Sequence, residues 1–170
     1  NINNFTVTVG NLTGTGGTIA NNGNAARILT IGSGDGTGGN FQGVIANNTN
    51  AGTGSLGLTK IGTGTITLSG VNTYTGVTTV TGGTLAVAVL ANGGVGSGIG
   101  AATGSDANLL LGNGTTLRYV GVGHSTDRGF RINGTAAGHG ATLDASGTGA
   151  VNFTNTASPT YGTVDQTRTL

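Results

Sequence analysis

The chain has 170 residues, of which 37 are glycine, 6% are charged and 4% are aromatic, and its formal net charge is +1. A near-neutral chain does not have the clustered Lys and Arg of a nucleic-acid-binding protein, and no run of about 20 apolar residues predicts a membrane span. The single proline, the low net charge and the many β-branched residues exclude intrinsic disorder. We therefore expect one folded domain over residues 1–170.

Short runs in which apolar and small polar residues alternate recur along the chain and end at Gly or Asn. Such period-2 runs predict β-strands, whereas the frequent Gly and β-branched residues disfavour helices. In chain order, strands are expected at residues 5–9, 27–31, 65–68, 77–81, 84–87, 109–111, 116–120, 142–145 and 150–154.

The short strands and tight corners distinguish among all-β architectures. A β-sandwich would need longer strands and large aromatic residues in its core. Short strands joined by Gly and Asn corners instead predict a β-solenoid, in which successive coils stack about 4.8 Å apart. If each coil has roughly 20 residues, the chain should form about seven or eight coils. Thr on the outer faces is expected to form ladders between coils.

The most specific pattern covers residues 58–87. A Lys is followed by Gly-x-Gly, an apolar strand, Ser-Gly, Asn-x-Tyr-x-Gly, a Thr/Val strand and Gly-Gly-Thr-Leu. This segment resembles the autotransporter-associated β-strand repeat, also called the passenger-associated transport repeat. The positions that carry the resemblance are Lys60, Gly62, Gly64, Ser69, Gly70, Asn72, Tyr74, Gly76, Gly82 and Gly83.

The resemblance implies a right-handed parallel β-helix from an exported passenger, located outside the cell or on the bacterial surface. Members of the family are mostly stalks, adhesins and toxin carriers, and the repeat is linked to secretion and folding. The expected function is therefore a non-enzymatic structural rod or filament segment. The alternative is an adhesin or glycan-binding module of an autotransporter passenger.

Within the motif, each residue type has a structural interpretation. Gly76 and the pair Gly82–Gly83 are expected at corners where a Cβ would clash with the adjacent coil. Asn72 is expected at a turn, in a left-handed conformation or stacked on another Asn. Tyr74 is expected to pack its ring at a corner, and Lys60 is expected to be a solvated charge before a strand.

The only cluster of charged residues lies between residues 118 and 131. Hydrolase triads are assembled from distant segments around an oxyanion hole, and no Gly-x-Ser-x-Gly elbow is present, so catalysis is not expected here. A loop network in which Asp127 pairs with Arg128 or Arg118 is one interpretation. A small patch that binds an acidic glycan or a neighbouring subunit is the other. The members of this cluster are Arg118, His124, Asp127, Arg128 and Arg131.

Other candidate sites are weak. Residues 32–39 are Gly-rich like a calcium-binding β-roll, but they hold one Asp and no tandem copy follows, so a flexible corner loop is expected. The five Asp residues are scattered and two lone His residues do not make a metal site. We expect no catalytic residue, no metal and no cofactor.

Both ends of the chain, residues 1–5 and 167–170, look strand-like and uncapped. Unpaired strand edges recruit further strands. We therefore expect association through coil ends, with other copies of the chain or with neighbouring repeats. A surface glycan is a further candidate partner.

Overall fold

The computed structural model describes residues 1–134, 138–161 and 168–169, with side chains as far as residue 161. This part of the chain contains 17 strands and no α-helix. Its two helical segments are three-residue 3₁₀ turns, η1 (Ser33–Asp35) and η2 (Asp106–Asn108). No helix among these residues has the length and apolar character needed to cross a membrane. The predicted all-β class is confirmed.

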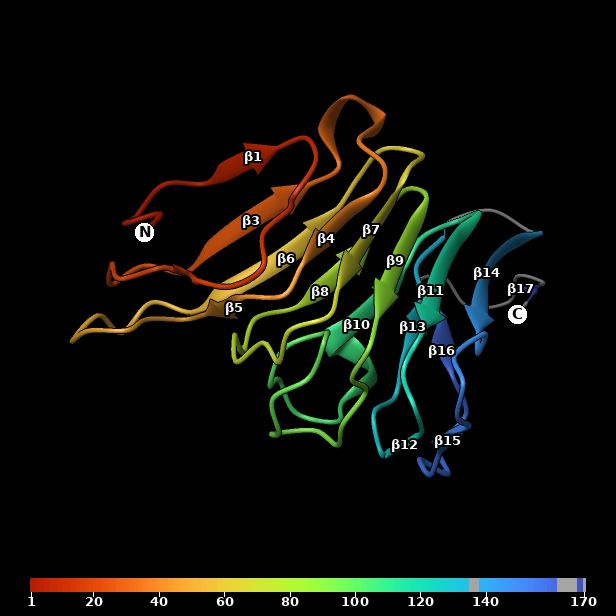
Figure 1. Ribbon diagram of the computed structural model, residues 1–170. Helices are drawn as coiled ribbons and strands as arrows, with labels where there is room; N and C mark the ends of the chain where they lie inside the picture. The colour runs from red at the N-terminus through yellow and green to blue at the C-terminus, as the bar shows by residue number, and fades with distance from the viewer. Residues whose placement is uncertain (135–137, 162–167, 170) are drawn as a thin grey trace.

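The strands form four sheets, and every strand pair is parallel (Figure 1). The seven-stranded sheet consists of β1 (Val7–Val9), β3 (Arg27–Ile31), β6 (Leu56–Lys60), β8 (Thr78–Val80), β10 (Leu109–Leu111), β13 (Arg131–Ile132) and β16 (Thr160–Tyr161). The six-stranded sheet consists of β4 (Gly39–Phe41), β7 (Thr65–Leu68), β9 (Thr84–Val87), β11 (Thr115–Tyr119), β14 (His139–Asp144) and β17 (Arg168–Thr169). The two-stranded sheets pair β2 (Thr18–Ala20) with β5 (Val44–Ala46), and β12 (His124–Thr126) with β15 (Val151–Phe153).

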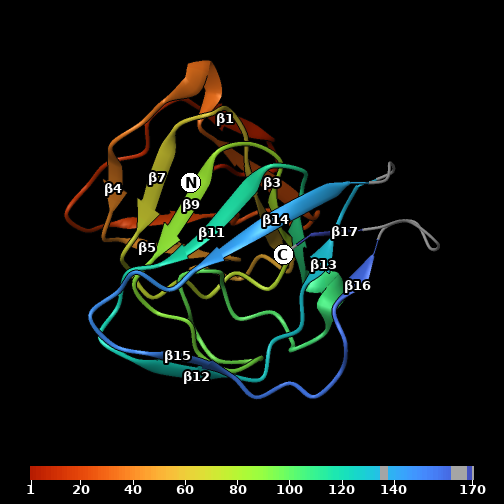
Figure 2. The same ribbon diagram turned by 90° about the vertical axis from the view of Figure 1, so that its right-hand side faces the viewer.

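Strand order follows chain order in each of these sheets. The chain therefore advances from its N-terminus at one end of the molecule to its C-terminus at the other (Figure 1). Seen from the side, the six-stranded sheet crosses the face turned to the viewer, and β12 and β15 run together along the lower margin (Figure 2). Each return of the chain to the seven-stranded sheet completes what we call a circuit.

The circuits alternate in length. Along the seven-stranded sheet, paired residues are separated by 22, 29, 20, 31, 21 and 29 positions, for the partners Val7–Leu29, Leu29–Leu58, Leu58–Thr78, Thr78–Leu109, Leu110–Arg131 and Arg131–Thr160. The predicted length of roughly 20 residues matches only the short circuits. Long circuits contain additional segments, such as residues 88–104 between β9 and η2.

Strand alternation separates the core from the surface. Inward columns of Leu, Ile, Val and aromatic side chains run from strand to strand, for example Ile66, Leu85, Leu117 and Leu143. Outward columns are rich in Thr, as predicted. They are Thr8, Thr30, Thr59 and Thr79 on the seven-stranded sheet and Thr65, Thr84, Thr116 and Thr142 on the six-stranded sheet.

All nine predicted strands are present: four have the predicted bounds and the other five differ at one or both ends by one to three residues. Seven of the other eight strands contain or adjoin Gly, Asn or Pro, which interrupt the alternation. The eighth, β17, lies in the C-terminal segment that was expected to be strand-like. β4 begins with Gly39-Asn40, and β6 contains Gly57. The sequence signal is therefore lost where the backbone pairs without a continuous apolar pattern.

The prediction that residues 1–5 are strand-like was wrong. Residues 1–5 do not continue a strand, because Asn3 and Asn4 have positive φ values (29° and 64°) and turn the chain before β1. At the other end, Arg168–Thr169 forms β17, whereas residues 167 and 170 lie outside the described residues.

Candidate functional site

The corner glycines of the 58–87 motif are confirmed. A Cβ at Gly76 would lie 2.5 Å from the carbonyl oxygen of Leu56, and one at Gly82 would lie 2.8 Å from that of Gly62. Gly83 combines a φ of +59° with a similar close approach to the preceding circuit. These positions exclude side chains because adjacent circuits are in backbone contact.

Lys60 is not the solvated charge that the sequence suggested. It is completely buried, because it occupies an inward column between Ile31 and Val80. Burial lowers the pKa of its ammonium group. Its Nζ donates to the carbonyl oxygens of Ile61 (2.7 Å), Gly62 (3.1 Å) and Gly82 (3.2 Å). Lys60 therefore joins two corners through their backbones.

Asn72 is also fully buried and bridges neighbouring segments of the chain. Its side-chain oxygen accepts from the backbone nitrogen of Ile45 (2.8 Å), and its amide donates to the carbonyl oxygen of Gly98 (3.0 Å). Asn72 has no positive φ and bonds to main chain rather than to another Asn, so neither expected role is observed.

Tyr74 packs inside the fold, as expected from its place in the motif. Its side chain is completely buried, and its hydroxyl group lies 2.7 Å from Oγ1 of Thr78. Burial raises its pKa above the ordinary tyrosine range. The hydroxyl of Thr78 also donates to the carbonyl oxygen of Ile99. The motif thus builds an internal polar network.

The predicted cluster at residues 118–131 is divided between the surface and the interior. Arg128 is only 3% exposed, so it is not available to a surface ligand. Burial lowers the pKa of its guanidinium, which nevertheless stays charged at neutral pH. Its Nε, Nη1 and Nη2 donate to the carbonyl oxygens of Ala91 (2.9 Å), Asn92 (3.2 Å), Val95 (3.0 Å), Gly100 (2.9 Å) and Ala102 (3.0 Å).

Asp127 does not pair with Arg128 or Arg118, contrary to the predicted network. Its Oδ1 accepts from the backbone nitrogen of Gly93 (2.7 Å). His124 lies on β12, where its Nδ1 is 2.8 Å from the hydroxyl oxygen of Tyr119. His124 therefore interacts within its own circuit, whereas Asp127 contacts the preceding one.

The two surface arginines of the cluster pair with other carboxylates. On the six-stranded sheet, Arg118 contacts Asp144 (Nε to Oδ2, 2.6 Å). On the seven-stranded sheet, Arg131 contacts Asp106 (Nη2 to Oδ2, 3.2 Å). The pairing partners are distant in sequence and meet only because adjacent circuits stack, so sequence alone did not identify them.

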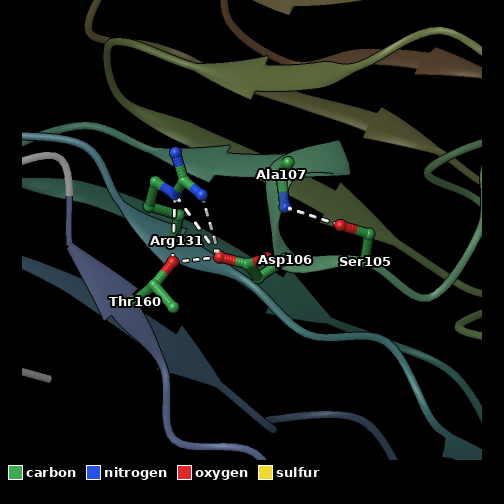
Figure 3. A network of polar contacts seen from close by, with 5 residues as sticks. All are labelled: Ser105, Asp106, Ala107, Arg131 and Thr160. Carbon is green, nitrogen blue, oxygen red and sulfur yellow. Dashed lines mark hydrogen bonds and ion pairs between the residues drawn. The ribbon is translucent and has the colours of Figure 1, made fainter.

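The Asp106 network connects three circuits (Figure 3). The hydroxyl of Thr160 donates to Oδ2 of Asp106 and accepts from Nε of Arg131 (3.0 Å). The hydrogen bond from Thr160, followed by that from Arg131, holds the pKa of Asp106 below its ordinary value. In the same way, the hydrogen bond from Arg118 lowers the pKa of Asp144.

The Gly-rich segment at residues 32–39 forms a corner that contains η1. Oδ1 of Asp35 accepts from the backbone nitrogen of Thr63 (2.8 Å), which lowers the pKa of this carboxyl group. Among the described residues, no three His or Asp side chains gather where they could hold a metal ion. Asp165 lies outside these residues.

Two apolar cavities lie toward the C-terminal end, with volumes of about 440 and 200 Å³. Both are lined by Leu143 and Phe153, and the larger one is also lined by Phe130 and by the Asp106–Thr160 pair. These aromatic and aliphatic side chains continue the inward columns of the core.

Comparisons with known proteins agree with the motif. Residues 58–87 match the family model described as passenger-associated-transport-repeat. The chain is 44% identical over 159 residues to the adhesin BmaC autotransporter of Brucella suis biovar 1 (strain 1330). That match includes 85% of this chain but only 4% of the much longer relative. No solved structure matches the chain significantly. The chain therefore carries an autotransporter passenger repeat, as its sequence predicted.

Proposed function

We propose that the chain is a non-enzymatic structural segment of a secreted bacterial surface protein. In this proposal each circuit is one coil of a parallel β-helix, which is right-handed like nearly all parallel β-crossovers. The observation that carries the proposal is the register of the seven-stranded sheet, where every circuit pairs with the next in chain order. The proposed role of the segment is then to form stacked coils.

The use of charged residues supports a structural role. Lys60 and Arg128 are buried among backbone carbonyls, and Arg118 and Arg131 form ion pairs between circuits. Catalysis on a β-helix needs acids, bases or metal ligands that project together from adjacent coils. In the part of the chain that the structure describes, Arg118, Arg131 and Arg128 instead connect one coil to another.

We propose that the coil ends associate with further coils, supplied by neighbouring repeats or by other copies of the chain. The edge strand β1 has one partner, and no charged side chain precedes Arg27. Exposed sheet edges are commonly blunted by Lys or Pro, and β1 has neither. At the opposite end, a further coil would cover the cavities beside Leu143 and Phe153.

The repeat also supports an extracellular location, either on the bacterial surface or after release from it. Its family is described as passenger-associated, and the Brucella relative is an autotransporter. The absence of cysteine means that stability outside the cell depends on stacked ladders and buried polar networks rather than on disulfides.

Electron microscopy of the purified chain without denaturant tests end-to-end stacking. Continuous thin filaments with a strand repeat of about 4.8 Å along their length are expected if coil ends join. Short separate rods at high protein concentration would contradict association between copies. Such rods would show that coils stack only within one polypeptide.

An adhesive role is the second candidate, because the Brucella relative is named an adhesin. The surface members of the predicted patch are Arg118 and Arg131, which lie on different sheets. A surface glycan with acidic groups would compete with the carboxylates of Asp144 and Asp106 for these guanidinium groups.

A double variant, Arg118→Ala with Arg131→Ala, tests this role. Binding of the chain to acidic glycans should fall at least tenfold, while the thermal midpoint changes little because both ion pairs are at the surface. The matched control is Arg27→Ala, which removes another exposed-strand arginine on β3. Equal binding by all three proteins would exclude the arginine patch as the adhesive surface.

A further inference from the structure

The segment at residues 88–104 differs from the rest of the fold because it contains no strand. It connects β9 to η2 and forms the additional length of the longest circuit. One isolated antiparallel bridge, between Ser97 and Asn72, connects it to the preceding circuit. Its apolar anchors in the core are Leu90, Ile99 and Ala102, each no more than 3% exposed.

Arg128 of the following circuit makes the largest number of the side-chain hydrogen bonds that hold this segment. Arg128 donates five hydrogen bonds of 2.9–3.2 Å, and all five acceptors are backbone carbonyl oxygens between residues 91 and 102. No ion pair among the described residues includes Arg128. The buried guanidinium thus supplies donors to five carbonyl groups outside the sheets, which would be costly to bury without hydrogen bonds. The carbonyl oxygens of Ala91, Asn92 and Ala102 each accept a second hydrogen bond as well.

Neighbours of Arg128 strengthen the same connection. The hydroxyl of Thr126 donates to the carbonyl oxygen of Ala91 (3.0 Å), and Oδ1 of Asp127 accepts from the backbone nitrogen of Gly93 (2.7 Å). The backbone nitrogen of Gly129 donates to the carbonyl oxygen of Gly104 (2.8 Å). The segment is thus tied to residues 126–129 along most of its length.

We propose that residues 88–104 form a strap that opens as one unit, and that Arg128 is the positioning residue that keeps it closed. The strap lacks the ladders that stabilise the sheets, so it can detach while the sheets stay intact. Opening breaks the hydrogen bond from the hydroxyl of Thr78 to the carbonyl oxygen of Ile99, and that from the backbone nitrogen of Ala101 to the main-chain carbonyl oxygen of Tyr74. It thereby exposes the hydroxyl network of Tyr74 and Thr78.

Native-state hydrogen exchange of the unmodified chain tests whether the strap opens separately. The backbone nitrogens of Gly94, Ser97, Gly98 and Ala101 are all hydrogen-bonded at 2.7–3.1 Å. These four amides should exchange with one common protection factor, at least tenfold below that of the sheet amides. Ile61 and Thr81 serve as references, because they bond across the sheet corners. Protection equal to that of the references would overturn the proposal.

Replacement of Arg128 tests its positioning role. In Arg128→Met, protection of the four strap amides should fall on the order of 100-fold, while Ile61 and Thr81 keep theirs. The control variant Arg118→Met removes a half-exposed arginine and should change neither set. If protection falls equally in the strap amides and the reference amides, or does not fall in the strap amides, Arg128 has no separate role in the strap.

Chemical rescue distinguishes the donor geometry from mere volume. Arg128→Ala leaves a space surrounded by carbonyl oxygens, and about 10 mM guanidinium chloride is far below denaturing concentrations. This ion should restore strap protection at least tenfold in the variant and leave the unmodified chain unchanged. Sodium chloride at equal ionic strength is the control. If the two salts have equal effects on strap protection, the carbonyl oxygens around position 128 do not bind guanidinium specifically.

Discussion

At the residue scale, the fold depends on where backbones touch and on which polar groups reach the interior. Gly70 has an ordinary φ, yet a Cβ there would lie 2.0 Å from the carbonyl oxygen of Gly43. Lys60 is buried because its ammonium group satisfies three carbonyl oxygens at corners. Neither requirement follows from local propensity, because Gly70 meets a carbonyl oxygen of the neighbouring circuit and Lys60 is enclosed between Ile31 and Val80 of the adjacent strands.

The close approach at Gly70 predicts a strong effect of one methyl group. Gly70→Ala should lower the free energy of unfolding by at least about 2 kcal/mol, because carbonyl and Cβ cannot both keep their positions. The matched control is Gly16→Ala, where no atom lies within 4 Å of the added Cβ. Gly16→Ala should leave stability unchanged or raise it by up to about 1 kcal/mol. Denaturant titrations compare the two variants, and similar losses in both would contradict contact between circuits at Gly70.

Burial of Lys60 predicts that loss of its charge destabilises the chain. Lys60→Met keeps much of the volume but leaves three corner carbonyls without their donor, at a cost of about 2 kcal/mol or more. Arg118→Met should cost no more than about 1 kcal/mol, since its ion pair is at the surface. Urea unfolding of both variants supplies the comparison. A neutral Lys60→Met would indicate that the ammonium group is solvated after all.

At the element scale, polar side chains join strands of successive circuits. Arg131 on β13 and Thr160 on β16 converge on Asp106 in η2, so three elements far apart in sequence share one carboxylate. Lys60 and Arg128 likewise connect circuits, because they donate to carbonyl oxygens of a corner and of the strap. Each connection uses the register of the parallel strands to bring its partners together.

The Asp106 network predicts a loss of stability in acid. The pKa of Asp106 is below its ordinary value of 3.8, so its contribution is present above that pH and disappears as the pH falls through the lower folded pKa. Asp106→Asn should be less stable than the unmodified chain at pH 6, and the difference should close toward pH 2. Unfolding free energies measured over this range test the prediction.

Thr160→Val is the informative control, because it keeps the carboxylate and removes the hydrogen bond that contributes most to its low pKa. As the pH falls, the free energy of unfolding of this variant should decrease less steeply than that of the unmodified chain. If both proteins decline identically, another carboxyl group is responsible for the acid sensitivity.

Much of the fold could be predicted from the sequence, whereas most of the site could not. Period-2 runs located nine strands, and the motif at residues 58–87 indicated its family. Lys60 and Arg128 were assigned to the surface because a lone charge in a short strand or loop is usually solvated. The acceptors of Arg128 and one acceptor of Lys60, the carbonyl oxygen of Gly82, belong to other circuits, which no local pattern reveals.

At the scale of the whole molecule, long and short circuits alternate, so two consecutive circuits together span 49 to 52 positions along the seven-stranded sheet, for example 51 from Val7 to Leu58 and 51 from Leu58 to Leu109. The strands stay in register while the added residues leave the sheets as corners and the strap. A passenger built in this way can vary its loops without disturbing its ladders, because only the sheet columns must remain aligned.

The register of the stacked parallel strands can be measured directly, because the chain contains no cysteine of its own. Thr30 and Thr59 are direct partners on adjacent strands, whereas Thr30 and Thr79 are two strands apart. Adjacent strands place Cα atoms about 5 Å apart, within disulfide range, and two strands place them near 10 Å, beyond it. Under mild oxidation, Thr30→Cys with Thr59→Cys should form an intramolecular disulfide, and Thr30→Cys with Thr79→Cys should not. Disulfide formation only in the second pair, or in neither, would contradict the stacked parallel circuits.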